Sequence, residues 1–529
     1  MGRVRVLDCT LRDGGYINDW KFGEEAIREV TKKIIRSGVE YFEIGFLRDT
    51  VYDPNKSLFP GNEEIAKIIS PKDTFTKYFA MQDMSAPLPL EKLGKRRDDA
   101  LDGIRVIFKK GKVEEGYHCC KKLIEMGYEV FAQFVGTDVY SDIELVETVQ
   151  KFNTIDIVGV AIVDTFGLIK RRDFTRMVGI IDHNLRQDMM IGYHSHNNLQ
   201  QATGNAQTLV EMNLNRDIVI DGCVFGMGRG AGNLNLELFL QYMNEEHGCN
   251  YRVEPLLEII DEYLNDIYQK DFWGYSLPFY LSATNGCHPN YAKYFAAKGT
   301  LTVKAFNELL RSIPAGVKEI YSAERAEEIY EDFQKIYVDD KEATGALQKL
   351  MRDRKILLLG PGKSIEVEQN QIQEFIRKEN PLIIALNFYT DDYPIDYIFS
   401  SHMRRYSKLE DIETVSKIIT SNIREARNYD YMLNYSSYYV RDPELMDNSG
   451  VTFLRFLIEI GVKKVYIAGL DGYDVRTEHN YVNSGLEYGF SKEIMEKRNF
   501  KISEKIKEFR GFINISFITE SLYDMMGEE

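Results

Sequence analysis

The sequence predicts an α/β protein whose N-terminal half is a (β/α)8 TIM barrel and whose C-terminal part is a second, Rossmann-like α/β domain. Eight short β-branched or aromatic runs alternate with helix patterns over the first 250 residues, the usual size of such a barrel. These runs are apolar almost throughout, which is typical of parallel strands covered on both faces. A similar alternation begins again at Lys355. A doubly wound open sheet is the competing arrangement for the first region, but eight regular units favour closure.

Each unit pairs a strand candidate with a helix candidate. Helix patterns include Glu24 to Ser37, Leu199 to Met212, and a segment that opens with Ser141 and Glu144, whose spacing predicts a capping box. The expected barrel strands are Val4 to Thr10, Tyr41 to Leu47, Thr74 to Asp83, Ile104 to Lys109, Tyr128 to Thr137, Ile155 to Asp164, Met189 to His196 and Ile218 to Gly226.

The length of 529 residues exceeds that of one ordinary domain. We expect the catalytic barrel at 1–250, a helical extension at 251–314, a helical connector at 315–354 and the Rossmann-like domain at 355–529. The extension is unusually aromatic, so it either caps the barrel or forms a dimer contact, and we expect a homodimer. Strand candidates after Lys355 are KILLLG, Leu382 to Asn387, Tyr397 to Ser400 and Val465 to Ala468.

The composition is that of an ordinary globular protein, with 44% hydrophobic and 28% charged residues. A formal net charge of -16 argues against a nucleic-acid or anionic-membrane partner, although a local basic pocket for an anionic substrate stays open. No apolar run approaches the roughly 20 residues that a membrane helix needs, and the start has no signal-peptide pattern. The six cysteines form no CxxC spacing, so we expect reduced thiols in a cytoplasmic protein.

The strongest local signal is YHSHNN, residues 193–198, at the end of the seventh expected strand. His194 and His196 are two positions apart, so on a strand both side chains project from the same face. Active sites of barrel enzymes lie at the carboxyl ends of the strands. Two neutral imidazoles there form half of a divalent-metal site. The alternative is a pair of structural histidines bonded to the backbone.

A second signal is LDCTLRDGGY, residues 7–16, where the first strand ends and the first βα loop begins. Asp13 can supply a carboxylate that completes a His-His-Asp shell with open positions for water and substrate. Arg12 brings a planar cation suited to an enolate or a carboxylate. The alternative is a tight turn with a surface ion pair.

The third signal is GMGRGAGNLNLE, residues 226–237, after the eighth strand. Its glycines, Gly228 among them, permit close approach of the backbone to a substrate, and Asn233 can offer an amide oxygen as a fourth ligand. Polar residues at other strand ends are weaker candidates for substrate binding: Glu43, Gln133, Asp164 and Thr165.

These three motifs, together with EIGF at 43–46 and VDTFG at 163–167, resemble the HMG-CoA-lyase-like (DRE-TIM) superfamily of metal-dependent aldolases and lyases. The likeness is greatest to 4-hydroxy-2-oxovalerate aldolases and covers roughly the first 310 residues. The resemblance implies that Asp13, His194 and His196 bind Mn2+ or Mg2+, that Asn233 is a further ligand, and that Arg12 steadies an enolate. The implied reaction makes or breaks a carbon–carbon bond between a 2-oxo acid, expected to be pyruvate reacting as its enolate on the metal, and an aldehyde.

The sequence departs from the aldolases at the general base. The aldolases carry a histidine shortly after R-D-G, and Tyr16 stands in that place here. Tyr16, Asp19, Tyr275 or His288 could supply the base. The Glu-Gln pair of the acyl-CoA-using branch is also absent. A Claisen-type condensing enzyme, similar to isopropylmalate or homocitrate synthases, and a non-catalytic barrel scaffold therefore remain as alternatives.

The C-terminal domain begins with GPGKS, residues 360–364, which lacks the first glycine of a Walker A motif. LLLGPGKS, DYIFSSHMRRY and VYIAGLDGYD resemble MptE-like and motility-accessory-factor Rossmann domains. The resemblance implies a phosphorylated or nucleotide-linked ligand at the glycine turn. A domain that serves assembly only is the alternative. The residues expected to flank such a site are His402, Arg404, Arg405, Asp471 and Asp474.

Overall fold

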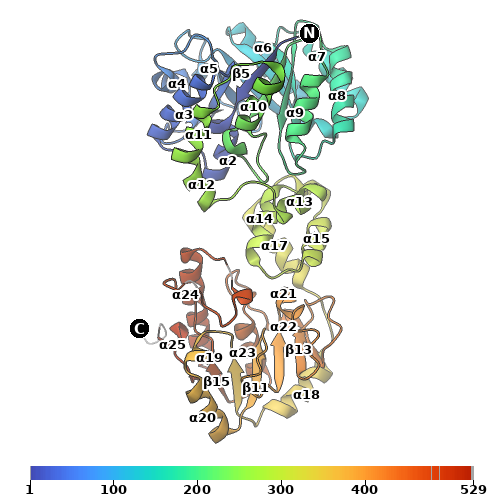
Figure 1. Ribbon diagram of the computed structural model, residues 1–529. Helices are drawn as coiled ribbons and strands as arrows, with labels where there is room; N and C mark the ends of the chain where they lie inside the picture. Colours follow the sequence, from blue (N-terminus) through green and yellow to red (C-terminus); the bar gives the residue numbers. More distant parts are fainter. Residues whose placement is uncertain (1, 478, 488, 526–529) are drawn as a thin grey trace. The chain divides into compact units, whose positions relative to one another are not determined.

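The computed structural model describes residues 2–477, 479–487 and 489–525, and the chain forms two compact units, Met1–Asn290 and Tyr291–Glu529 (Figure 1). The division falls inside the segment 251–314, so α15 (Val303–Ser312) belongs to the second unit.

The first unit is a closed parallel barrel, as the sequence predicts. β1 pairs with β9 on one side and with β2 on the other, which closes the sheet. The two-residue strand β3 (Leu58–Phe59) adds to the outside of β2. The eight barrel strands are β1 Val4–Asp8, β2 Tyr41–Leu47, β4 Lys77–Asp83, β5 Gly103–Lys109, β6 Glu129–Val135, β7 Gly159–Asp164, β8 Met190–Ser195 and β9 Ile218–Gly222.

Helices surround these strands in Figure 1. All seven residues of β2 and all six of β7 are buried, because helices cover one face of the sheet and side chains fill the barrel on the other. The outer helices are α3 Glu24–Ser37, α4 Asn62–Ile69, α5 Leu90–Leu93, α6 Val113–Glu125, α7 Asp142–Phe152, α8 Arg171–Asn184, α9 Ala202–Glu211 and α10 Leu236–His247. The first has the bounds that the sequence predicts, and α7 begins at the expected capping box of Ser141 and Glu144.

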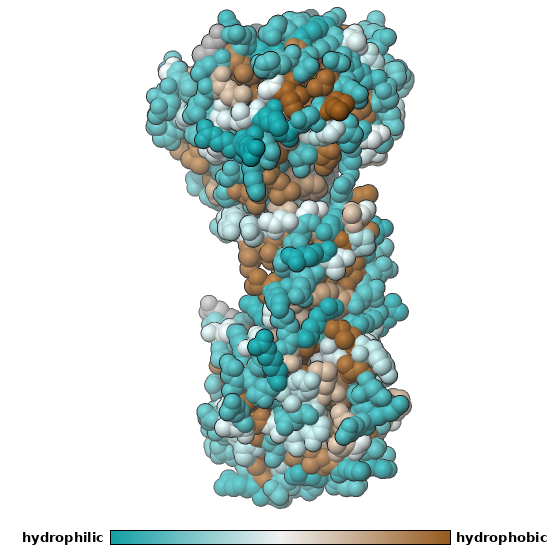
Figure 2. All heavy atoms as spheres, turned by 90° about the vertical axis from the view of Figure 1, so that its right-hand side faces the viewer, coloured by the Kyte–Doolittle hydropathy of each residue, from teal (hydrophilic) through white to brown (hydrophobic). Residues whose placement is uncertain are grey.

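Short helices follow the barrel within the first unit: α11 Glu254–Ile259, α12 Asn265–Lys270 and α13 Leu277–Thr284. The first of them packs against α3. Between α12 and the start of α13 several large apolar side chains are exposed: Phe272, Tyr275, Leu277 and Tyr280. Hydrophilic residues otherwise dominate the face drawn in Figure 2, with scattered hydrophobic patches, as expected for a globular surface.

The second unit contains a seven-stranded, wholly parallel sheet in the order β14-β13-β12-β11-β10-β15-β16. Four of its strands lie where the sequence predicts them, and β13, β14 and β16 were not predicted. The strands are β10 Ile356–Leu359, β11 Leu382–Leu386, β12 Tyr397–Ser400, β13 Ser416–Thr420, β14 Tyr431–Leu433, β15 Lys464–Ala468 and β16 Asn514–Phe517.

Both faces of this sheet are covered, since alternate residues of β10 belong to two different cores. Ile356 and Leu358 pack with α18, α23 and α24, whereas Leu357 and Leu359 pack with α20. The helices of the second unit are α16 Ala315–Lys318, α17 Ala323–Gln334, α18 Lys341–Met351, α19 Ser364–Val367, α20 Gln369–Glu379, α21 Met403–Tyr406, α22 Tyr435–Tyr438, α23 Ser449–Glu459, α24 Lys492–Phe509 and α25 Leu522–Met525; α14 Pro289–Lys298 crosses the boundary. Among the described residues, no helix combines the length and apolar character needed to cross a bilayer.

Candidate metal centre at the barrel mouth

Arg12 and Asp13 lie at the carboxyl end of β1. The sequence places them on the first βα loop, and within that connection they form the short helical turn α1 (Thr10–Asp13). The turn forms because the amides of Arg12 and Asp13 both donate to the carbonyl of Cys9, at 3.1 and 2.8 Å. It aims both side chains into the barrel, where they are 2% and 1% exposed.

The structure brings Asp13, His194 and His196 together. One ligand atom from each lies within 4.8 Å of the others. The Nε2 atoms of His194 and His196 are each 3.9 Å from a carboxylate oxygen of Asp13, one facing Oδ1 and the other Oδ2. His194 is in β8, and His196 is the first residue beyond it. Two imidazoles and one carboxylate facing a common point form a donor set suited to a divalent cation.

Asp221 of β9 orients His194 from behind. Its Oδ2 lies 3.1 Å from Nδ1 of His194. The other ring nitrogen of His194, Nε2, therefore faces Asp13. Carboxylates commonly support metal-binding histidines in this way. Burial opposes the charged form of His194, but Asp221 and Cys9 outweigh it and raise its pKa to about 9. A cation bound at Nε2 of His194 would displace the proton that this nitrogen carries in the charged imidazolium.

The other two groups are already in the state that a cation requires. Burial lowers the pKa of His196 to about 3, so its imidazole is neutral at pH 7. Burial alone would raise the pKa of Asp13, but Arg12 and the two histidines hold it well below the usual range. Asp13 therefore stays a carboxylate beside a neutral ligand.

Asn233 reaches the same point from the loop after β9. A backbone bridge pairs it with His196, and its Nδ2 donates to Oδ2 of Asp13 at 2.6 Å and to the carbonyl of Met227 at 2.9 Å. A Cβ atom on Gly228 would lie 2.2 Å from Nδ2 of Asn233 and 3.2 Å from that Asp13 oxygen. Glycine at 228 therefore leaves room for the contact between Asn233 and Asp13.

A buried charge network holds Arg12 in place; it consists of Arg12, Glu43, Arg105, Gln133 and Asp221. Glu43 Oε2 accepts from Nε of Arg12 at 2.7 Å and from Arg105 at 3.0 Å. Arg105 also donates to Gln133 at 3.1 Å and forms an ion pair with Asp221. Arg12 in turn pairs with Asp13. The guanidinium of Arg12 is thus fixed beside the Asp13–His194–His196 cluster.

Several buried polar atoms around this centre have no hydrogen-bond partner among the described residues. Unsatisfied buried polar groups are costly, and a ligand or an ion would satisfy them. Among them are Glu43 Oε1, Gln133 Nε2, Asp221 Oδ1 and Asn233 Oδ1. Together with the donor set, they fit a barrel that receives a divalent cation and a polar small molecule.

Tyr16 and His288 are joined through Arg229, which the sequence did not single out. The guanidinium carbon of Arg229 lies 4.1 Å from the centroid of the Tyr16 ring, and its Nη1 donates to Nε2 of His288 at 2.6 Å. Burial raises the pKa of Tyr16, so the phenol is protonated at neutral pH. Burial, with the charge of Arg229, lowers the pKa of His288 to about 3.

The other candidates for the base are exposed. Tyr275, in the loop before α13, has 58% of its surface exposed. Asp19 pairs with Lys56 and its side chain is 68% exposed. Thr165, just after β7, uses its hydroxyl to accept a hydrogen bond from the amide of Gly136 at 2.8 Å, so it supports the neighbouring loop after β6.

Sequence reasoning also missed Arg105 and Asp221. A usable signal was present, because each is a lone charged residue inside an otherwise apolar strand. A strand buried on both faces offers such a residue no route to solvent, so it must find an opposite charge inside the barrel. Arg229 carried no comparable signal, since it lies in a glycine-rich loop.

The chain is similar to several known proteins. The HMGL-like family model matches residues 109–260. A 4-hydroxy-2-oxovalerate aldolase of Thermomicrobium roseum is 27% identical over 249 residues, 46% of this chain and 67% of the relative. An oxaloacetate decarboxylase of Mycobacterium tuberculosis is 25% identical over 233 residues, 44% of this chain and 67% of the relative. The N-terminal domain of a candidate aldolase from Bacteroides vulgatus superposes with a TM-score of 0.47 at 24% identity, covering 55% of this chain and 96% of that one.

The fold and the site define a parallel (β/α)8 barrel with an Asp-His-His cluster at the carboxyl ends of its strands. The HMGL-like family model and the aldolase relatives support assignment of the barrel to the HMG-CoA-lyase-like (DRE-TIM) superfamily, in agreement with the resemblance seen in its sequence motifs. Its relatives are aldolases and lyases, so metal-dependent aldolase or lyase chemistry is the function class that they support.

Proposed function

We propose that the barrel is a divalent-metal-dependent carbon–carbon lyase that cleaves or joins a 2-oxo acid, pyruvate in the first instance, and an aldehyde. The observation that carries the proposal is the convergence of Asp13, His194 and His196 within 4.8 Å, backed by Asp221. Mn2+ or Mg2+ held there, with Asn233 as a further contact, would act as a Lewis acid on the carbonyl of the 2-oxo acid.

The residues around the metal position suit an anionic substrate that gains charge at its carbonyl oxygen. Arg12 is fixed between Glu43 and Asp13, and its positive charge would stabilise negative charge that develops on that oxygen. Gln133 has a buried Nε2 without a partner among the described residues, and this amide can donate to the substrate carboxylate. Gly228 lies beside Asp13 and Asn233, and Thr165 directly follows β7.

Proton transfer at the aldehyde end falls to Tyr16 and His288. Tyr16 is protonated at neutral pH and can donate a proton. Neutral His288 can accept one only when its Nε2 is released from the hydrogen bond with Arg229. Arg229 contacts both side chains and fixes their positions relative to each other. Tyr275 remains a further candidate only if the exposed segment before α13 reaches the substrate.

The names of the two relatives support a 2-oxo acid substrate. One is named for 4-hydroxy-2-oxovalerate and the other for oxaloacetate, and both of these compounds are 2-oxo acids. A Claisen-type condensation would use the same enolate with an acyl-CoA. Thiol release from acetyl-CoA in place of pyruvate release from 4-hydroxy-2-oxo acids would identify that alternative.

The test combines metal content with activity. His194→Ala and His196→Ala, singly and together, should lose bound Mn2+ in elemental analysis and slow pyruvate release by at least about 100-fold. His183→Ala, an exposed histidine on α8, is the matched control and should behave as wild type. Full metal content and activity in the double variant would contradict the proposal. Absence of metal and of oxaloacetate decarboxylation in the wild type would favour a scaffold.

We also propose that the second unit binds a phosphorylated or nucleotide-linked ligand and that the chain forms a homodimer. The parallel sheet with glycine turns after β10 and β15 supports the first proposal. The exposed apolar residues between α12 and α13 support the second. Light scattering of the purified protein decides the oligomeric state.

A further inference from the structure

Arg229 differs from other arginines at the mouth of the barrel. Arg12 and Arg48, which follow β1 and β2, each form an ion pair with a carboxylate. Arg229, in the glycine-rich loop after β9, contacts the ring of Tyr16 and the imidazole of His288 instead. It forms no ion pair with any residue that the structure describes. The protein therefore does not neutralise this cation.

An unpaired guanidinium in this position costs free energy. Arg229 is half-buried, and arginine keeps its charge in proteins. The Tyr16 ring, 4.1 Å from its guanidinium carbon, and the neutral His288 hold the group in place, but neither carries a negative charge. Partial burial of a charge without a counter-charge is unfavourable. An anionic group on a ligand would supply the counter-charge.

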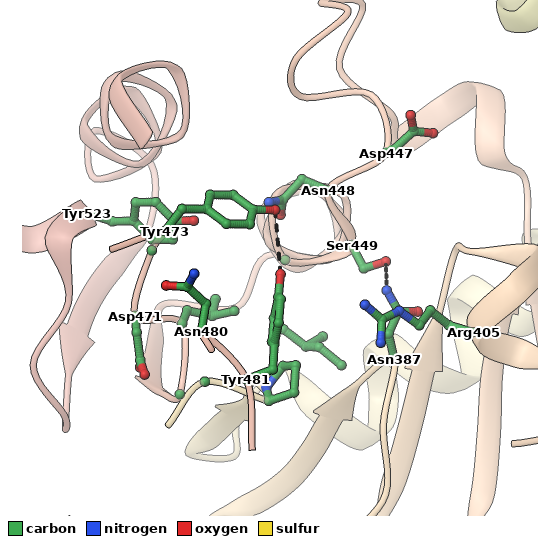
Figure 3. A pocket seen from close by; sticks show the side chains of 17 residues that line it. Asn387, Arg405, Asp447, Asn448, Ser449, Asp471, Tyr473, Asn480, Tyr481 and Tyr523 are labelled. Atoms are coloured by element: carbon green, nitrogen blue, oxygen red, sulfur yellow. Dashed lines mark hydrogen bonds between the residues drawn. The ribbon is translucent and has the colours of Figure 1, made fainter. Parts of the chain in front are cut away.

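The pocket of the second unit shows a different arrangement. Arg405 lines it together with Asp447 and Asp471 (Figure 3). A cation and carboxylates therefore share one lining there. At Arg229 the counter-charge has to come from outside the described chain, which makes the barrel mouth the place where an arginine awaits an anion.

The backbone around Arg229 also suits an anion. The amides of Gly228, Arg229 and Gly230 follow one another and donate a hydrogen bond to no described residue. Gly228 and Gly230 are buried, and buried amides without an acceptor are costly. Gly230 has a φ of +67°, and successive amides in such turns form concave sites for anions. A ligand that reaches Arg229 therefore meets further hydrogen-bond donors.

Two aromatic rings connect Arg229 with the metal position. Tyr16, on which Arg229 lies, contacts Phe46 with ring centroids 6.0 Å apart. The guanidinium carbon of Arg12 lies 5.7 Å from the centroid of Phe46, and Arg12 pairs with Asp13. One cation thus lies beside the metal position and another further along the same aromatic surface. The proposed function assigns the aldehyde to Tyr16, so Arg229 belongs to the aldehyde end of the site.

We propose that Arg229 binds a carboxylate or a phosphate on the aldehyde, so that the second substrate of the barrel is an anionic aldehyde. The proposal rests on the proposed carbon–carbon lyase function and adds the substrate class to it. The formal net charge of -16 repels anions at long range, so recognition of an anion falls to local groups. A guanidinium binds either anion through two parallel hydrogen bonds, and the test distinguishes them.

The test compares aldehydes that differ in the anionic group. Succinic semialdehyde carries a carboxylate that butanal lacks, and glyceraldehyde 3-phosphate carries a phosphate that glyceraldehyde lacks. In each assay the methyl carbon of pyruvate loses a proton and bonds to the aldehyde carbon, whose oxygen gains a proton. We expect the wild type with Mn2+ to show at least about 10-fold higher kcat/KM for the charged member of one pair, which identifies the anion. Equal values within both pairs would contradict the proposal.

Arg229→Gln separates anion binding from a positioning role. Loss of positioning at Tyr16 and His288 slows both members of a pair equally and leaves their ratio unchanged. Loss of anion binding lowers the ratio at least about 10-fold, mainly through KM. Arg229→Lys keeps the charge without the fork and should retain part of the preference. Arg36→Gln, exposed at the end of α3 away from the barrel mouth, is the control and should keep the wild-type ratio. An unchanged ratio in Arg229→Gln would overturn the proposal.

Binding without turnover gives a second readout. Oxalate takes the place of the 2-oxo acid and cannot add to an aldehyde, so isothermal titration of the Mn2+ and oxalate complex measures affinity for the charged aldehyde alone. Arg229→Gln should weaken this affinity at least about 10-fold, and equal affinity in the variant and the wild type would contradict the proposal.

Oxaloacetate decarboxylation needs no aldehyde and tests the proposed function separately. Decarboxylation by a wild type that shows no preference for a charged aldehyde would overturn this inference alone. Absence of both decarboxylation and aldol addition would overturn the proposed function and this inference with it.

Discussion

Glu43 accepts hydrogen bonds from two buried arginines and has no exposed surface. Replacing it with glutamine keeps the shape of the side chain but leaves Arg12 and Arg105 short of one negative charge. Breaking a buried ion pair in this way costs about 3–5 kcal/mol. We expect Glu43→Gln to lower the free energy of unfolding by that amount in urea denaturation and to reduce kcat. Glu147→Gln, exposed on α7, is the control, and an equal effect of both changes would contradict the role of the network.

The ionisation of Asp164 makes the free energy of unfolding depend on pH. Burial raises its pKa to about 7, although the amides of Leu168 and Ile169 donate to it at 2.8 and 3.1 Å. A carboxyl with a raised pKa in the folded state contributes stability fully below its unfolded pKa, and this stability is lost as the pH rises through about 7.

The difference in unfolding free energy between wild type and Asp164→Asn should therefore fall by about 4 kcal/mol from about pH 4 to about pH 8. Urea denaturation across that pH range measures it. The exposed Asp173→Asn should show no such trend. If the difference in unfolding free energy between wild type and Asp164→Asn did not change with pH, the carboxyl of Asp164 would have an ordinary pKa in the folded protein.

The sequence allowed prediction of the cluster of Asp13, His194 and His196 because the signals of these residues are local. His194 and His196 are two residues apart at a strand end, and Asp13 follows the first strand. Arg105 and Asp221 meet across the barrel, 116 positions apart in the chain, and such a pairing depends on how the strands close. The Arg229–His288 contact, 59 positions apart, likewise follows from the tertiary structure.

Among elements, the length of the apolar run decided what could be predicted. The eight barrel strands have five to seven residues each and are bounded by helix patterns. β14 and β16 have three and four residues and lie in polar sequence, so their neighbours in the sheet determine them. α1 forms from carbonyl and amide contacts in TLRD, which carries no helix pattern of its own.

The capping box of α7 gives a prediction at this scale. The amide of Glu144 donates to the Ser141 hydroxyl at 3.3 Å, and the Glu144 carboxylate accepts from the amide of Ser141 at 2.8 Å. Ser141→Ala should lower the unfolding free energy by about 1 kcal/mol. Ser141→Asp, which can still cap, should retain most of the stability. Equal losses in both variants would show that the cap contributes little.

At the scale of the molecule, the two units have separate hydrophobic cores and should unfold in separate transitions. A cation held by Asp13, His194 and His196 binds only the folded barrel. Mn2+ at about 100 times its dissociation constant should therefore raise the barrel midpoint by roughly 5 °C. Scanning calorimetry with and without EDTA measures both transitions, and a shift of the second one alone would contradict a metal site in the barrel.

The position of the cation itself is best measured by anomalous diffraction at the manganese edge from crystals grown with Mn2+ and pyruvate. We predict one strong peak within coordination distance of Asp13, Nε2 of His194 and Nε2 of His196, with pyruvate oxygens completing its shell. A manganese peak elsewhere in the barrel, or none beside these three residues, would contradict metal-dependent chemistry at this site.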